Sequence, residues 1–208
     1  MDPWQASALT FAIDFLLCKC GITIFVDYFE NTSMTDIIKK TGFSIGLILG
    51  VLLILLSSYI YFVNLALLTN VWAGVSTLAL TVLFGIISIV VIKGKLGGFI
   101  TFKEAFSGYF ITILTGSLLS CFYLVLLYTF FLSSETKEAI IIAMRDFDVS
   151  LLKQNLMPQE NIDKTLEVYK TFNPFSISTV LTSFIKYLLR DCLIGFLVAL
   201  IFRNKRTL

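Results

Sequence analysis

The sequence predicts an all-α, polytopic membrane protein with four transmembrane helices and a helical insert between spans three and four. Of its 208 residues, 57% are hydrophobic and 14% are charged, whereas soluble domains carry about 25% charged residues. The mean hydropathy is +0.90. Positions 41 to 92 and 105 to 134 contain no charged residue. Because a helix needs about 20 apolar residues to cross the hydrocarbon layer, these stretches hold three spans.

The first two spans are expected to be antiparallel neighbours, because the uncharged loop between them, from Asn64 to Asn70, is short. Two amphipathic helices are expected after the third span, within a polar insert at 135–173 that carries seven acidic and five basic residues. The predicted elements are spans at about 42–64, 71–92, 101–134 and 175–202, and insert helices at about 135–155 and 158–171. The corresponding regions are 34–134 for spans one to three, 135–173 for the insert, and 174–208 for span four and its basic tail.

The third helix has a specific start signal. Thr101 and Glu104 have the S/T-x-x-E spacing of a capping box, in which each side chain bonds the other residue's backbone amide. A catalytic role for the Glu104 carboxylate is the alternative, but capping explains this residue without a further assumption.

The distribution of basic residues predicts the orientation. Eight of them flank the expected spans on one side: Lys39, Lys40, Lys93, Lys95, Lys103, Arg203, Lys205 and Arg206. The five on the other side all lie in the insert, where acidic residues outnumber them. Since basic residues in short loops stay in the cytoplasm, both ends of the four-span core, including the C-terminus, are expected there, with the insert outside.

Residues 1–33 form an N-terminal extension that fits no clear class. The apolar run from Ala6 to Val26 is interrupted by Asp14 and Lys19, each of which opposes insertion by roughly 2.5–3.5 kcal/mol near a helix centre. The start also lacks the basic n-region of a signal peptide. We therefore expect the native chain to begin at Met34, and the intact mass of the protein tests this.

Composition argues against several kinds of chemistry. The chain has no histidine, so the commonest metal ligand and general base is missing. Four cysteines are expected to be unpaired apolar residues, although Cys18 and Cys20 form a C-x-C whose alternative role is metal binding. The net charge of +2 gives no general basic field for nucleic acid. No cofactor, metal site or enzymatic activity is therefore expected, and the lipid bilayer is the expected surrounding.

Small residues recur every fourth position on two spans. The first span carries Gly42, Gly46 and Gly50, and the third carries Gly108, Thr112, Gly116 and Ser120. Such faces allow helix backbones to approach closely in a membrane. Packing of span one against span three within the chain is the favoured interpretation, and a homo-oligomer seam is the alternative.

The fourth span contains Lys186, Arg190 and Asp191. Ionisable groups inside a membrane are candidate functional sites, so these three form a candidate polar patch for an ion, a proton or a lipid headgroup. The alternative is that Lys186 extends to the surface while Asp191 neutralises Arg190. Because adjacent residues point about 100° apart on a helix, we expect this pairing to be imperfect and other groups to complete it: Tyr59, Tyr61, Tyr123, Tyr128 or Asp14.

The connector between spans two and three carries the pattern G-x-x-[ST]-F-x-E-A-F-x-x-G, here with Thr101, Phe102, Glu104, Ala105, Phe106 and Gly108. With the order of spans, the single polar insert and the basic tail, it resembles a family of small bacterial inner-membrane proteins catalogued as domain of unknown function forty-one ninety-nine. The resemblance covers about Thr35 to Leu208. It implies a four-helix membrane core in a bacterial inner membrane and no assigned activity.

Two functions compete on this sequence. In the leading interpretation the chain is a non-enzymatic structural or interaction component of the cell envelope, and the insert at 135–173 meets another envelope protein. The alternative is a small transporter or channel component that uses the polar patch. A water-accessible cavity around Arg190 and Asp191 would favour transport, and a sealed bundle would favour interaction.

Overall fold

The protein is represented by a computed structural model that describes residues 33–204. The expectations for residues 1–32 and for Lys205 and Arg206 lie outside the described residues. Every regular element between 33 and 204 is a helix, which confirms the all-α class. Three of these helices are long and apolar enough to cross a membrane: Asp36–Phe62, Val71–Lys95 and Phe102–Phe131.

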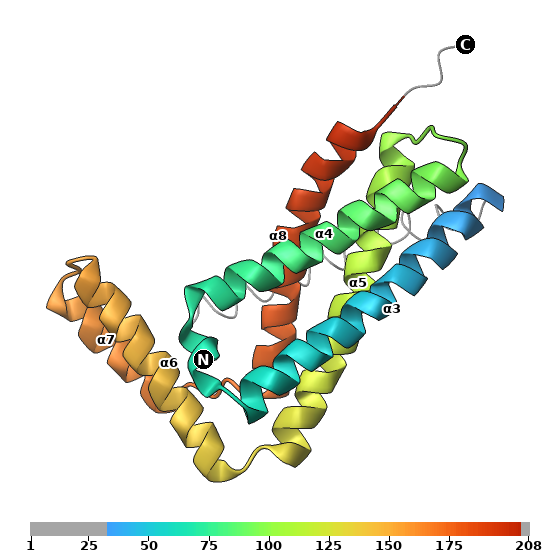
Figure 1. The fold of residues 1–208 in the computed structure, drawn as a ribbon. Helices are drawn as coiled ribbons and strands as arrows, with labels where there is room; N and C mark the ends of the chain where they lie inside the picture. Colours follow the sequence, from blue (N-terminus) through green and yellow to red (C-terminus); the bar gives the residue numbers. More distant parts are fainter. Residues whose placement is uncertain (1–32, 205–208) are drawn as a thin grey trace. The chain divides into compact units, whose positions relative to one another are not determined.

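The first two of these helices follow the expected hairpin. Helix α3 (Ser33–Phe62) and helix α4 (Val71–Lys95) run antiparallel, as Figure 1 shows. The short connection between them contains the 3₁₀ helix η1 (Leu65–Thr69), which the sequence did not predict. The side chains of Asn64 and Asn70 accept hydrogen bonds from backbone amides at the starts of η1 and α4, so each asparagine caps the helix that follows it.

The third membrane-capable helix consists of α5 (Phe102–Leu126) and a π-helical turn, η2 (Leu127–Phe131). The backbone amide of Leu132 bonds the carbonyl of Leu127 at 3.1 Å, which is the wide spacing of a π turn. The chain then leaves the bundle. The sequence predicts an uninterrupted helix to Ser134. It does not reveal the π turn, because an uncharged sequence contains no signal that distinguishes a π turn from an α turn.

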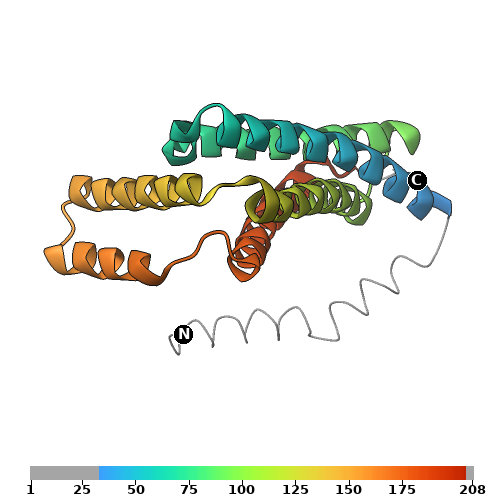
Figure 2. The same cartoon turned by 90° about the horizontal axis from the view of Figure 1, so that it is seen from below.

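Two helices of the polar segment follow, α6 (Ser134–Gln154) and α7 (Gln159–Thr171). They lie side by side in Figures 1 and 2 and pack against each other. The hydroxyl of Tyr169 donates a hydrogen bond of 2.5 Å to the Asp148 carboxylate and so joins the two helices. Just after the end of α6, Leu156 has a φ of 53° and is exposed.

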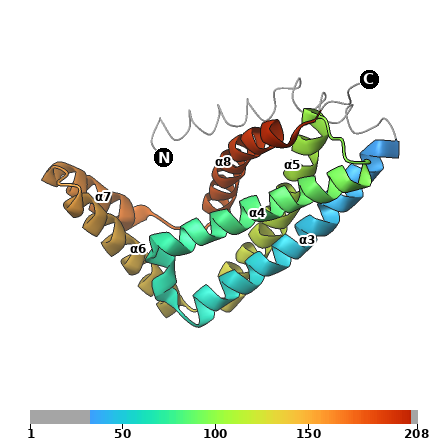
Figure 3. The same cartoon turned by 45° about the horizontal axis from the view of Figure 1, so that its top comes forward.

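The last helix, α8 (Ile177–Phe202), packs against α5 and α4. Figure 3 shows α8 and α5 as neighbours. Its N-cap is Ser176, whose hydroxyl accepts a hydrogen bond from the Thr179 amide. Its 26 residues are within the range of the three membrane-capable helices, but the charged residues in its middle distinguish it from them.

The buried core is concentrated where the basic connector joins α4 to α5. It includes Ile89, Ile92, Ile100, Tyr109 and Val198, from three helices and the connector. In the connector, Gly97 and Gly98 have φ values of +80° and +87°, a conformation that side chains disfavour. The backbone amide of Asn204 donates to the Ile100 carbonyl at 2.9 Å, so the end of α8 is attached to the same connector.

Candidate functional site

A cavity of about 510 Å³ lies between α3, α4, α5 and α8, with α6 and the segment before α8 also contributing. Its walls are largely apolar, with hydroxyl groups distributed among them. Among the lining residues from the part of the chain that the structure describes, Arg190 and Asp191 are the two that carry a charge. The hydroxyl groups on its walls include those of Tyr61, Thr81, Ser117, Tyr128, Thr179 and Ser183.

The cavity ends at the same level on all four helices. The lining residues nearest the connector along the four helices are Leu53, Thr81, Ser117 and Asp191. One turn further toward the connector, each helix has a buried residue: Leu49, Gly85, Ile113 and Gly195. Since residues four apart share a helix face, the cavity is closed on the connector side by the packed core.

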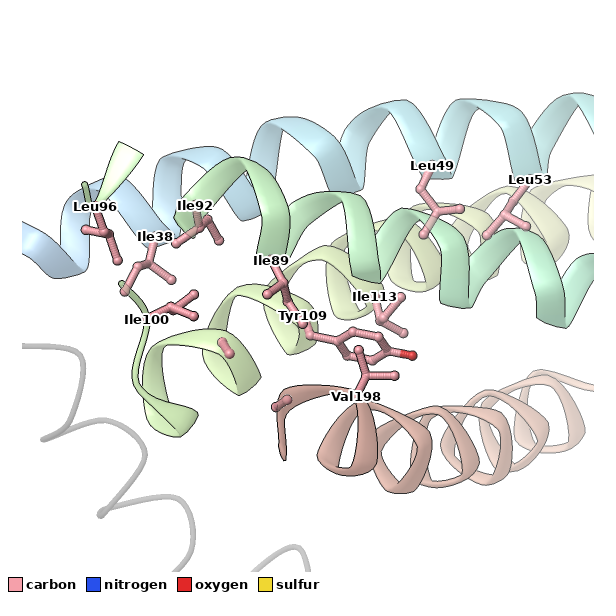
Figure 4. Packing of buried hydrophobic residues seen from close by; sticks show 12 residues of the cluster. Ile38, Leu49, Leu53, Ile89, Ile92, Leu96, Ile100, Tyr109, Ile113 and Val198 are labelled. Carbon is pink, nitrogen blue, oxygen red and sulfur yellow. The ribbon is translucent and has the colours of Figure 1, made fainter. Parts of the chain in front are cut away.

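Tyr109 forms the centre of this closure. A Cβ atom at either Gly85 or Gly195 would overlap its ring, so the ring lies directly against the backbones of α4 and α8. Figure 4 shows the ring beside Ile113 and Val198, with its hydroxyl pointing away from Leu96 and Ile100. Within residues 33–204 this hydroxyl is buried and has no hydrogen-bond partner.

Arg190 and Asp191 pair with each other. Nε of Arg190 donates a 2.9 Å hydrogen bond to Oδ1 of Asp191, and Nη2 lies 2.9 Å from the same oxygen, so the two residues pair through one carboxylate oxygen only. The flexible arginine side chain folds back along the helix and compensates for the angle between adjacent positions. It also lies over the ring of Tyr187, 5.1 Å from the ring centre, where a cation is attracted by the aromatic face.

The two charged groups differ in exposure. The Asp191 side chain is 6% exposed and that of Arg190 is 44% exposed. Oδ2 of Asp191 and Nη1 of Arg190 have no hydrogen bond to any part of the chain that the structure describes. The pair therefore has one acceptor, Oδ2 of Asp191, and one donor, Nη1 of Arg190, that are not used between the two residues.

The tyrosines that were candidates to complete the Arg190–Asp191 pair have other surroundings. Tyr61 and Tyr128 share a hydrogen bond and meet edge to face, and both line the cavity. Tyr123 bonds Ser58 at 2.5 Å, and Tyr59 is exposed. Asp14 lies outside the described residues. None of these four tyrosines, from α3, α5 and η2, bonds Arg190 or Asp191 in the structure.

Lys186 is separated from the other members of the candidate patch. It is an exposed residue and does not line the cavity. The structure thus brings Arg190 and Asp191 together and leaves Lys186 outside.

The small residues of α3 and α5 face each other. A Cβ at Gly46 would lie 2.7 Å from the Thr112 carbonyl oxygen, and one at Gly50 would lie 3.2 Å from that of Gly116. Gly42 likewise lies beside Gly108, and the Thr112 hydroxyl is 3.2 Å from the Gly42 carbonyl oxygen. This face of α3 is in contact with α5 of the same chain, so a homo-oligomer cannot use it without separating them.

The connector has the capping geometry. The amide of Thr101 donates to Oε2 of Glu104 at 2.8 Å, and the amide of Glu104 donates to the Thr101 hydroxyl at 3.3 Å. The Glu104 carboxylate is thus engaged at the start of α5, away from the cavity.

Sequence reasoning missed four residues of this region: Gly85, Tyr109, Tyr187 and Gly195. Two signals were present. Gly195 follows Asp191 by one turn on the same face, and Tyr187 precedes Arg190 by three residues, which also places them on one face. No pattern in the sequence links Tyr109 to either glycine, because the contact is between different helices.

The structure describes no candidate metal centre. Between residues 33 and 204, no three side chains of His, Cys, Asp or Glu lie together in a way that would hold a metal ion.

Comparisons with known proteins place the chain in one family. No curated protein matches the chain, and no solved structure matches it. A family profile described as "Protein of unknown function (DUF4199)" matches residues 44–204. This match includes the connector and the four helices that enclose the cavity, so the chain belongs to the DUF4199 family.

Proposed function

We propose that this chain is a multi-pass protein of a bacterial inner membrane with α8 as its fourth span. The length of α8 supports this, as does its packing against α4 and α5, two helices that are apolar enough to cross a membrane. Its charged residues are compatible with a span because Asp191 and Arg190 neutralise each other and Asp191 faces the bundle interior.

In this proposal the C-terminus is cytoplasmic and the α6–α7 segment is outside. Basic residues lie at the connector-side ends of all four helices: in the second turn of α3, the last turn of α4, the first turn of α5 and directly after α8. These ends are also joined to one another: the Lys95 ammonium donates to the Thr41 hydroxyl at 2.9 Å, and Asn204 bonds Ile100. A basic side of the bundle next to the cytoplasm agrees with the positive-inside rule.

The proposed role is that of a solute-binding component of a transporter or channel. One observation carries it: a cavity within the bundle is lined by the Arg190–Asp191 ion pair, whose carboxylate is buried, and is closed on the connector side by Tyr109. Burying the Asp191 carboxylate costs desolvation, and a purely structural bundle has no need of that cost beside a cavity. The role is non-enzymatic in this proposal, with no cofactor, and its immediate surrounding is the bilayer.

Four helices rarely enclose a complete pathway, so we propose that the protein works as a homo-oligomer or beside another membrane protein. The face of α3 that contacts α5 is excluded as the contact surface. Exposed apolar residues on other faces remain for it, such as Leu55 and Val51 on α3 and Leu193 and Leu197 on α8.

Four serine-to-cysteine variants test the cavity. In a background whose four native cysteines are replaced, single cysteines are placed at Ser117 and Ser183 in the cavity, Ser150 on α6 and Ser88 in the sealed core. A membrane-impermeant thiol reagent is added to intact cells. We expect positions 150, 117 and 183 to react and position 88 to remain unreacted. Reaction at 150 alone would contradict a water-accessible cavity and favour a sealed bundle.

A second role, interaction with another envelope protein through the α6–α7 segment, rests on a different observation. Leu156 is 91% exposed and adopts a backbone conformation that leucine disfavours, and Met157 beside it is also exposed. An apolar tip held at such a cost suits a contact with a partner. A photo-crosslinking residue at position 156 is expected to give a discrete adduct in cells, and the same residue at 163 on the polar face of α7 is expected to give none.

A further inference from the structure

We infer that the base of the cavity binds a zwitterion, with its ammonium group on Asp191 and its anionic group on Arg190. This inference rests on the proposed function and specifies the chemistry of the ligand. It concerns a primary ammonium group and an anion within one small molecule or headgroup.

The Asp191 carboxylate can accept a hydrogen bond from a further donor. Its Oδ1 accepts a hydrogen bond from Nε of Arg190 and lies 2.9 Å from Nη2, while Oδ2 accepts no hydrogen bond from the described part of the chain. The side chain is 6% exposed, and Asp191 lines the cavity. A carboxylate can only accept hydrogen bonds, so a ligand group that bonds Oδ2 must be a donor. An ammonium group supplies both the donor and a favourable charge.

The Arg190 guanidinium can receive the anionic group. Nε and Nη2 are used on Asp191, and Nη1 is not used within residues 33–204. The side chain lines the cavity and is partly exposed, and its plane lies over Tyr187, which limits its orientation. Guanidinium groups bind carboxylate and phosphate oxygens well because their donors are arranged in a rigid plane.

Charge balance selects a zwitterion over a simple ion. Arg190 and Asp191 together carry no net charge, and no other charged residue of the described range 33–204 lines the cavity. A ligand with a net charge would therefore leave an uncompensated charge inside the membrane, where that is expensive. A zwitterion brings one charge to each partner and leaves the site neutral.

The rest of the cavity limits the remainder of the ligand. Its volume of about 510 Å³ is within the usual range for small-molecule sites. Its walls include Leu124, Phe184 and the paired Tyr61 and Tyr128, which suit an apolar or aromatic substituent. Two sources present this chemistry: a free α-amino acid, with ammonium and carboxylate, and a phosphatidylethanolamine headgroup, with ammonium and phosphate.

The test uses the full chain in nanodiscs of phosphatidylglycerol, which contain no zwitterionic lipid. Binding of leucine and phenylalanine is measured by calorimetry, together with their methyl esters, which are cations, and their N-acetyl derivatives, which are anions. In a second arm, phosphatidylethanolamine is added to the nanodiscs, and lipid retained by the protein after extraction is counted by native mass spectrometry.

We expect one of two results. Either the free amino acids bind at least tenfold more tightly than their singly charged derivatives, or phosphatidylethanolamine is retained in preference to phosphatidylglycerol. Asp191→Asn and Arg190→Gln should each reduce that preference at least tenfold. Lys186→Gln removes a charge from the same helix outside the cavity and should change it less than twofold. The double variant Arg190→Gln/Asp191→Asn leaves no unpaired charge, and so should fold and still fail to bind.

The results separate the two proposals. If cysteines at Ser117 and Ser183 react but neither zwitterion class is preferred, the ligand assignment is wrong and the solute cavity stands. Preference that survives in the double variant also overturns the assignment. If those cysteines do not react, the proposed function itself fails.

Discussion

The ring of Tyr109 in α5 fills the space beside Gly195 in α8 so completely that a Cβ atom at position 195 would overlap it. Gly85 of α4 is in the same position on the other side of the ring. One aromatic side chain therefore joins three helices through two glycines, directly below the cavity.

The first prediction concerns this contact. Gly195→Ala should lower the free energy of unfolding by about 1–3 kcal/mol, because overpacking a tight core forces backbone shifts. Thermal unfolding of the detergent-solubilised protein, followed by circular dichroism, measures it. Gly94→Ala in α4 is the matched control, since a Cβ there meets nothing within 4 Å. Equal melting temperatures for the two variants would show that the ring does not pack as described.

The second prediction compares two glycines of α3. A Cβ at Gly46 would lie 2.7 Å from a backbone oxygen, whereas one at Gly50 would lie 2.7 Å from the end of the Leu119 side chain. Because a side-chain end can move and a backbone carbonyl cannot, Gly46→Ala should be the more destabilising, by about 1 kcal/mol or more. The same melting experiment checks this. Greater damage from Gly50→Ala would argue against this register of α3 on α5.

The third prediction concerns the pH dependence of the α6–α7 contact. Burial, and then the hydrogen bond to the Asp148 carboxylate and its charge, raise the pKa of the Tyr169 phenol above its usual value near 10. The folded state then holds the phenolic proton where the unfolded state has lost it. The stabilisation is complete below about pH 10 and is lost as pH rises from there toward the higher folded pKa.

Tyr169→Phe should remove about 1 kcal/mol of local stability at neutral pH. Hydrogen exchange of residues 134–171, measured by mass spectrometry, reports this in the full-length protein. Above about pH 10 the wild-type protein should lose its extra protection from exchange, so that its protection approaches that of the variant. Parallel pH profiles for the two proteins would contradict the proposed hydrogen bond.

The fourth prediction concerns Leu156. The amides of Leu156 and Met157 bond the carbonyls of Lys153 and Leu152, which is the pattern of a helix end that normally uses glycine. Leu156→Gly should stabilise the end of α6 by roughly 0.5–1 kcal/mol, because the left-handed conformation costs leucine and not glycine. Leu151→Gly, within α6, should destabilise it by about the same amount. Slower hydrogen exchange in the first variant and faster exchange in the second would agree with this.

The same photo-crosslinking residue can be placed at position 157 and combined with Leu156→Gly. If Leu156→Gly removes the adduct at position 157, the leucine serves a contact at the expense of stability. An adduct that persists in this variant would separate the conformation of Leu156 from any partner.

The sequence was sufficient for features that depend on local order along the chain. Long uncharged runs predict the membrane-capable helices. In lipid, only helices and closed barrels satisfy all the hydrogen bonds of the backbone. The capping pair Thr101 and Glu104 predicts the start of α5, since both partners lie within one turn. Gly46 and Thr112 could be assigned to small-residue faces by their spacing, though the spacing could not say whether the two faces meet.

The tertiary structure decided the features that depend on which helix faces which. Tyr109 reads as one aromatic residue among many, and only its position between Gly85 and Gly195 makes it the closure of the cavity. The sequence places Arg190 and Asp191 inside a helix, but their pairing depends on a side-chain rotamer, and their role depends on the space that the other helices leave open. Contacts between helices far apart in the chain leave no periodic signal, because each partner satisfies only its own helix pattern.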